Sequence, residues 1–111
     1  MDIRRERILS GIMTLLILSK LCEGPAHGYL LESYIEEKLK RSIPPGTVYV
    51  LLSTLKRRGF VVVKSKEIVK GRQIATYEIK PEGIRFLRQH KEPLNLMKSV
   101  IEDLLKKIEC V

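Results

Sequence analysis

The sequence is poor in the residues from which many active sites are built. It has no tryptophan, only 5% aromatic residues, two cysteines and two histidines. Cys22 and Cys110 are too few and too far apart for a disulfide framework, and adding His27 and His90 does not produce metal-binding spacing. No nucleophile is paired with a base, and there is no glycine-rich phosphate loop. The sequence therefore predicts a protein without a metal or a cofactor, and not an enzyme.

Long apolar runs are also missing. A membrane-spanning helix needs about 20 consecutive apolar residues, whereas the apolar stretch over residues 8–21 is interrupted by Ser10, Thr14 and Lys20. No small-residue cleavage site follows it, so we expect neither a membrane span nor a signal peptide. A length of 111 residues with 44% apolar residues suits one domain with one core. We expect a soluble, cytoplasmic protein.

Acidic residues are scarce in only one part of the chain. Residues 41–90 contain eleven Lys and Arg against three acids, a balance of 11 − 3 = +8, which equals the net charge of the whole chain. Residues 1–40 carry six groups of each sign, and residues 91–111 carry four of each. An excess confined to one block predicts one basic face, and the usual partner of such a face is a polyanion.

Hydrophobic spacing predicts three helices in the first half of the chain. Residues 7–22 are apolar nearly all round, which is typical of a buried central helix or of one partly at a dimer interface, and Cys22 should be buried there. A second helix is predicted over residues 26–40. A third, over residues 45–58, has Pro45 at its first position. Its buried face is predicted from apolar residues at i, i+3, i+4 and i+7, namely Val48, Leu51, Leu52 and Leu55.

The second half predicts a hairpin and two further helices. Residues 60–69 and 73–80 are rich in Val, Ile, Thr and Tyr, so we expect two strands joined by a basic turn. A fourth helix begins at Pro81, and Pro93 interrupts it before a last helical segment. That segment carries apolar residues spaced 3-4-3-4, which is typical of helices that pair with one another. The predicted dimer-interface residues are Leu94, Met97, Ile101, Leu104 and Ile108.

This order of elements predicts an α+β, mainly α fold: a winged helix-turn-helix of three helices and a two-stranded wing, with a C-terminal dimerisation helix. We expect residues 1–90 to form the DNA-binding domain and residues 91–111 the dimerisation helix, in one unit. The third helix buries one side and can present the other to the major groove, which admits a single α-helix. Double-stranded DNA is therefore the predicted polyanion.

Four motifs in the same order resemble the PadR family of transcriptional regulators. They are His27–Tyr29, Gly46–Leu52, Arg58–Val61 and Thr76–Gly83. The resemblance covers roughly residues 8–90 and implies a regulator that is, in most members, a dimeric repressor. It also implies that Thr47 and Tyr49 contact the DNA backbone near the amino end of the third helix. Some relatives respond to ligands, so a small-molecule effector is conceivable, although the sequence does not point to one.

The candidate DNA-binding residues lie on the outer face of the third helix and on the hairpin. They are Thr47, Tyr49, Val50, Ser53, Lys56, Arg57, Lys64, Lys66, Lys70 and Arg72. Tyr49 could instead be an aromatic residue at the edge of the core, and one cation of the Lys56–Arg58 run could serve only the helix dipole. Two other functions remain open: a non-specific architectural DNA-binding protein, and a winged-helix adaptor that binds protein. The sequence does not reveal the operator, the regulated genes or the effector.

Overall fold

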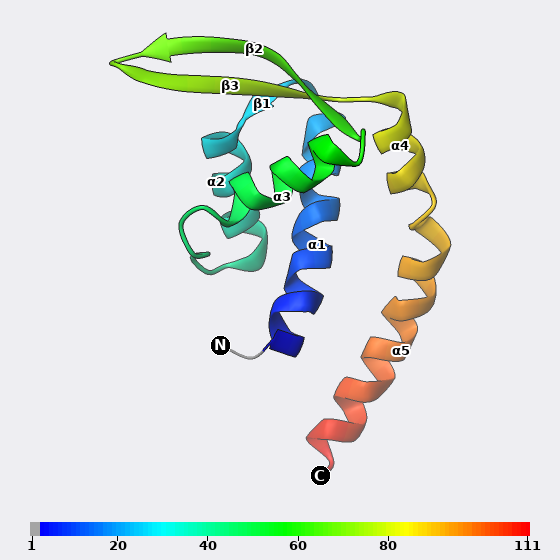
Figure 1. The fold of residues 1–111 in the computed structure, drawn as a ribbon. Coiled ribbons are helices and arrows are strands. Elements are labelled where there is room, and N and C mark those ends of the chain that lie inside the picture. Colours follow the sequence, from blue (N-terminus) through cyan, green and yellow to red (C-terminus); the bar gives the residue numbers. More distant parts are fainter. Residues whose placement is uncertain (1–2) are drawn as a thin grey trace.

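The structure, a computed structural model, describes the backbone of residues 3–111 and the side chains of residues 8–111, and it places five helices and three strands there. In chain order they are α1 Ile3–Leu21, β1 Ala26–His27, α2 Gly28–Leu39, α3 Thr47–Arg57, β2 Val61–Val69, β3 Arg72–Ile79, α4 Pro81–Arg88 and α5 Lys91–Glu109. The predicted α+β, mainly α winged-helix fold is confirmed (Figure 1).

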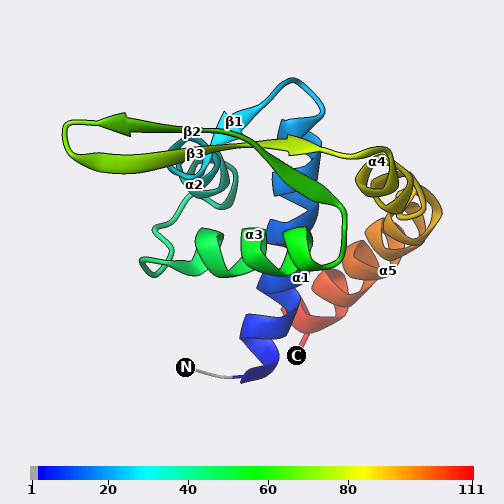
Figure 2. The same ribbon diagram turned by 45° about the horizontal axis from the view of Figure 1, so that its top comes forward.

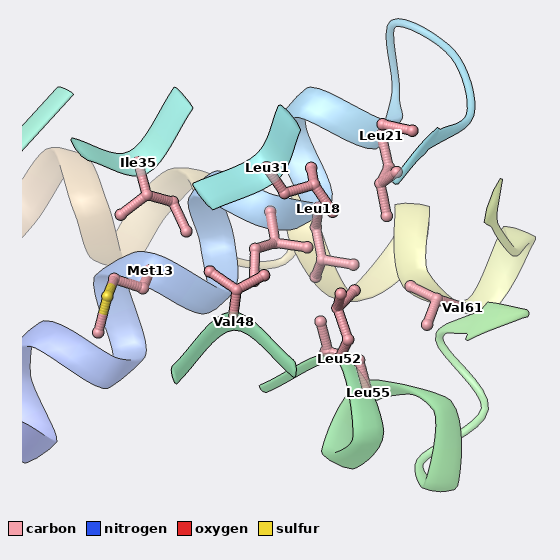
Figure 3. Packing of buried hydrophobic residues seen from close by; sticks show 11 residues of the cluster. Met13, Leu18, Leu21, Leu31, Ile35, Val48, Leu52, Leu55 and Val61 are labelled. Atoms are coloured by element: carbon pink, nitrogen blue, oxygen red, sulfur yellow. The ribbon is translucent and has the colours of Figure 1, made fainter. Parts of the chain in front are cut away.

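One apolar cluster holds α1, α2, α3 and the start of β2 together (Figure 3). The largest fully buried side chains are Ile17, Leu18, Leu31, Ile35, Val48, Leu52, Leu55 and Val61. The predicted inner face of α3 is confirmed, with Leu51 half-buried beside the three buried residues. Truncating such a leucine to alanine typically costs about 2–5 kcal/mol. The core therefore fixes which side of α3 faces outward.

The sheet has a third strand that the sequence did not predict. Its order is β1-β3-β2, all antiparallel, and β1 pairs Ala26 with Tyr77 and His27 with Thr76. The prediction that the second helix begins at Ala26 is therefore wrong. His27 is extended, with φ −91° and ψ 164°, and its Nδ1 accepts the N–H of Leu30 at 3.2 Å. Because an N-cap residue is not helical, α2 starts at Gly28 and the two residues before it are free to pair with β3.

Helix α3 also starts later than predicted, so Pro45 is not its first residue. Gly46 is the N-cap, with φ 84° in the left-handed region that glycine tolerates. The helical hydrogen bonds open with Val50 N–H donating to the Gly46 carbonyl at 3.1 Å. Pro45 and Gly46 instead form a turn, because a left-handed residue cannot continue a right-handed helix.

Strands β2 and β3 form the wing, a long hairpin with one irregularity. Val63 pairs with Tyr77 and Ser65 with Thr76, which leaves Lys64 as an extra residue in a β-bulge. At the other end Val69 pairs with Arg72, so Lys70 and Gly71 form a two-residue loop. Their φ values of 51° and 77° are those that tight hairpin turns require.

Pro93 does not interrupt the last helix but lies within the first turn of α5. A proline at this position needs no backbone N–H bond, because the first four N–H groups of a helix have no partner within it. Its ring would clash with the carbonyl four residues earlier, at Gln89, and the helix breaks there, between α4 and α5. The break that we assigned to Pro93 therefore falls one turn before it.

The wing and α5 extend away from the core. The radius of gyration is 15.9 Å, whereas a globular chain of this length would have about 13 Å. Figures 1 and 2 both show the hairpin tip projecting beyond α2, and α5 running away from the sheet. Not one residue of α5 is buried. The prediction that Cys22 is buried is wrong, since α1 ends at Leu21 and the Cys22 side chain is exposed.

Candidate nucleic-acid interface

The outer face of α3 is exposed along its whole length. Tyr49 and Val50 are 53% and 66% exposed, and Ser53, Lys56 and Arg57 are also exposed. This face combines a phenol, a short apolar side chain, a hydroxyl and two cations. Such side chains suit contacts to phosphates and to base edges in a major groove.

Thr47, which the family resemblance assigns to the DNA backbone, lies at the first position of α3 and hydrogen-bonds to the turn before it. It is half-buried, and both its Oγ1 and its N–H donate to the Pro44 carbonyl, at 2.8 and 3.3 Å. Its side chain borders a largely apolar cavity of about 460 Å³ between α1, the end of α2 and the connector before α3. Thr47 thus stabilises the turn at the start of α3, and donating to a phosphate would require it to release Pro44.

The predicted cations of the wing differ in how free they are. Lys64, on the bulge, forms an ion pair with Glu78 at 3.7 Å, so its charge is partly balanced. Among the side chains that the structure describes, Lys66, Lys70 and Arg72 form no ion pair, and all three are exposed. Exposed ion pairs contribute little to stability. The three unpaired cations are therefore the ones that can meet an anion without first giving up a partner.

Arg58 has a structural role. Its guanidinium carbon lies 4.8 Å from the centre of the Phe60 ring and 5.0 Å from that of Phe86. Those two rings stack at 4.6 Å, and Phe86 also contacts His90, whose Nδ1 lies 2.8 Å from the Phe86 carbonyl oxygen. Arg58 therefore ties the end of α3 to α4 and to the start of α5. Of the three cations that end this helix, Lys56 and Arg57 remain available to DNA.

A concave site lies where the start of α2, α3 and the wing meet. This cavity has a volume of about 500 Å³ and brings together Tyr49 of α3 with Lys66 and Arg72 of the wing. Its other lining residues were not assigned to DNA from the sequence, and three of these carry aromatic rings: His27, Tyr29 and Tyr77. These residues lie close to one another because β1 pairs with β3. A strand of two residues has no periodic pattern by which the sequence could predict it.

The aromatic side of this cavity is closely packed. A Cβ atom added to Gly28 would lie 2.6 Å from Cε1 of Tyr49, so the Tyr49 ring rests directly on the backbone at the start of α2. Burial raises the pKa of the Tyr77 phenol, and the nearby Tyr49 raises it further. A phenol is protonated at neutral pH even at its ordinary pKa, so this upward shift leaves Tyr77 able to donate a hydrogen bond.

The model of the family named 'Transcriptional regulator PadR-like family' matches residues 17–89 of this chain. The chain is a member of the PadR-like family. As a PadR-like regulator, the protein is a DNA-binding transcriptional regulator. Members of this family are generally not enzymes. The match ends at residue 89, so it covers α2, α3, the wing and α4 but not α5.

Solved structures agree with this assignment. A Thermoplasma acidophilum protein described as transcriptional regulator TA0346 is 42% identical, with 93% of this chain and 97% of that chain covered and a TM-score of 0.83. A transcriptional regulator of Clostridium thermocellum is 28% identical, with coverages of 87% and 96% and a TM-score of 0.75. A PadR family regulator of Clostridium difficile R20291 is 26% identical, with coverages of 84% and 97% and a TM-score of 0.68. No curated protein matches the chain.

Two further features of this PadR-like chain bear on its chemistry. Among the residues that the structure describes, no three His, Cys, Asp or Glu side chains come together as metal ligands would. No helix in the described part is both long enough and apolar enough to cross a bilayer.

Proposed function

We propose that this PadR-like protein is a homodimeric repressor that inserts α3 of each protomer into a major groove and lays the wing along the neighbouring backbone. The observation that carries the proposal is the basic outer surface of α3 and the wing, two elements that share the cavity lined by Tyr49, Lys66 and Arg72. Five cations without an ion pair among the described side chains lie on it: Lys56, Arg57, Lys66, Lys70 and Arg72. A surface of this kind, on a helix that fits a major groove, suits duplex DNA.

The surface of α5 supports the homodimer. Eight large apolar side chains of this helix are exposed: Leu94, Leu96, Met97, Val100, Ile101, Leu104, Leu105 and Ile108. All five residues predicted for the interface are among them. A helix in a protein gains most of its stability from packing of its apolar face, and no residue of this 19-residue helix is buried in the single chain. The helix carries four cations and four acids, which gives no net charge to repel a second copy.

Two-fold symmetry links the two parts of the proposal. A symmetric dimer presents two copies of α3, and dimeric readers of this type bind half-sites about one helical turn, ~34–36 Å, apart. Repression is the mode that the family resemblance implies, and occupation of a promoter by such a dimer is sufficient to produce it. We also assign residues 1–90 to DNA binding and residues 91–111 to dimerisation.

The proposal is tested by measuring mass and DNA binding together. Sedimentation at micromolar concentration should give twice the mass of the chain, and fragments selected from the source genome should contain an inverted repeat. Fluorescence anisotropy should show at least ~10³-fold tighter binding to a selected fragment than to a random duplex at the same salt. A ratio near one would mean architectural binding instead, and a monomer without DNA affinity would refute both readings.

A further inference from the structure

The cavity between the start of α2, α3 and the wing has the composition of an anion site. Ten residues line it, and none of them is acidic. Two are cations, Lys66 and Arg72, and three are tyrosines, Tyr29, Tyr49 and Tyr77. Phenol hydroxyls can donate hydrogen bonds to an anion, and the hydrogen bonds that the two cations make to it are strengthened by charge. The other large cavity, which Thr47 borders, has a single cation, Arg41, among largely apolar walls.

This cavity is large enough and open enough to hold a segment of nucleic-acid backbone rather than a single ion. A volume of about 500 Å³ greatly exceeds the ~30 Å³ that a water molecule occupies. It offers room for a phosphate together with the sugars on either side of it. Tyr29 is 70% exposed at this site, so its ring can lie against a sugar while its hydroxyl reaches a phosphate oxygen.

The position of the cavity relates it to the groove that α3 would enter. Tyr49 belongs both to the outer face of α3 and to the wall of the cavity, while Lys66 and Arg72 come from the wing. A duplex lying on α3 therefore has its backbone at this edge. The same geometry brings the start of α2 within reach of that backbone, through Tyr29.

We propose that this cavity, the phosphate pocket, holds one phosphodiester of the DNA backbone in each half-site, and that Tyr29 is a phosphate contact. The pocket deepens the proposed function and rests on it, since its ligand is the backbone of the DNA that α3 reads. Three strands and two helices contribute to the pocket, so one bound phosphate fixes the wing and α3 in a single register on the duplex.

Phosphate ethylation interference on a selected duplex tests the proposal directly. Ethylation removes the charge of one phosphate at a time, and the positions that block binding mark the phosphates that the protein touches. In the wild type we expect a blocking phosphate at the edge of each half-site. With Tyr29→Phe, binding to unmodified duplex should weaken by about 3–10-fold, and ethylation at that one position should block less. Tyr34→Phe is the matched control, because this tyrosine lies beneath Lys20 and Lys38 instead.

A second variant tests the packing that shapes the pocket. Gly28→Ala would place its Cβ against the Tyr49 ring and push that ring from its present position. We expect weaker DNA binding with an unchanged melting temperature, whereas Gly11→Ala on α1, where nothing lies within 4 Å of the new atom, should bind as the wild type does.

The outcomes separate the pocket from the function on which it rests. If the wild type binds no duplex, the proposed function and the pocket both fail. If it binds duplex but Tyr29→Phe leaves both affinity and interference pattern unchanged, the pocket alone is refuted. Backbone amide shifts at Tyr29 and Lys66 with millimolar inorganic phosphate, together with unchanged duplex binding by Tyr29→Phe, would assign the pocket to a free phosphate compound and overturn our choice of ligand.

Discussion

The protein presents two exposed surfaces of opposite character. The surface of α3 and the wing is cationic and has few acids, and two of the three acids in residues 41–90 are already paired, Glu78 with Lys64 and Glu82 with Arg85. The surface of α5 is apolar along one side and carries no net charge. Both remain uncovered in the single chain, yet only the second is unfavourable in free energy while it faces water.

This difference indicates what each surface binds. Exposed cations are well solvated, so the α3–wing surface is stable alone and gains from an anion mainly through the release of counterions. Exposed leucine and isoleucine side chains gain instead from burial, at about 25 cal/mol per Å² of apolar area. The first surface should therefore show strong salt dependence in its binding, and the second almost none.

The largest effect is expected from a charge on the apolar surface. Ile101→Glu would place a carboxylate in the middle of the proposed dimer interface, where burial without a partner is costly. We expect a monomer by sedimentation and, because the two half-sites then bind independently, a decrease in DNA affinity of about 10²–10⁴-fold.

Ser99→Glu is the matched control for that experiment. It adds the same charge to the polar side of α5, where the Ser99 hydroxyl donates to the Leu96 carbonyl and has no other partner among the described residues. This variant should stay dimeric. A dimeric Ile101→Glu protein would show that another surface holds the protomers together.

A smaller effect, limited to one base pair, is expected at Ser53. Its side chain is exposed on α3 and makes no hydrogen bond among the described residues, so it is free to contact a base edge. Ser53→Ala should change the preference at one position of the operator by about 1–3 kcal/mol and leave affinity for random duplex unchanged. Binding measured against a set of single-base operator variants checks this, and a uniform decrease across the set would exclude base reading by Ser53.

The wing should affect all DNA sequences alike. Lys70→Asn with Arg72→Gln removes two unpaired cations, and asparagine tolerates the left-handed backbone that Lys70 adopts. We expect about tenfold weaker binding to every duplex, and a decrease of about one unit in the salt slope for each phosphate that the wing no longer neutralises. Lys64→Gln is the comparison, because Lys64 is paired with Glu78 and should change the slope least. A changed sequence preference in the double variant would make the hairpin a reading element.

Much of the fold was predictable because its core follows local spacing. The apolar positions of α3 and the Val-rich hairpin predict their elements directly, and the basic excess of residues 41–90 marks the functional surface. The start of α2 was missed because capping by His27 and pairing with β3 decide it, and neither leaves a periodic signal. Pro45 was misplaced because the backbone of Gly46, rather than the proline, determines where α3 begins.

The candidate site was predictable only in part, for a similar reason. Charge and the amphipathic pattern identify Lys66, Arg72 and the outer face of α3, since these residues belong to a single element each. Tyr29 joins them only through packing between elements distant in sequence. Conversely, composition alone cannot distinguish Lys64, which has an acidic partner across the sheet, from Lys66, which has none among the described side chains.

The smallest effect concerns a cation that we assign to neither surface. Arg58 lies over Phe60 and Phe86, and the flat guanidinium suits such stacking better than an ammonium does. Arg58→Lys keeps the charge but weakens the stack, so the free energy of unfolding should decrease by about 0.5–1 kcal/mol. The salt slope of DNA binding should not change.

Arg57→Lys is the control for this prediction. Arg57 lies one residue earlier, is exposed and has no aromatic neighbour among the described side chains, so this change should leave stability unaffected. Chemical denaturation and anisotropy titrations on both variants make the comparison, and a lower salt slope in Arg58→Lys would place Arg58 on the DNA surface after all.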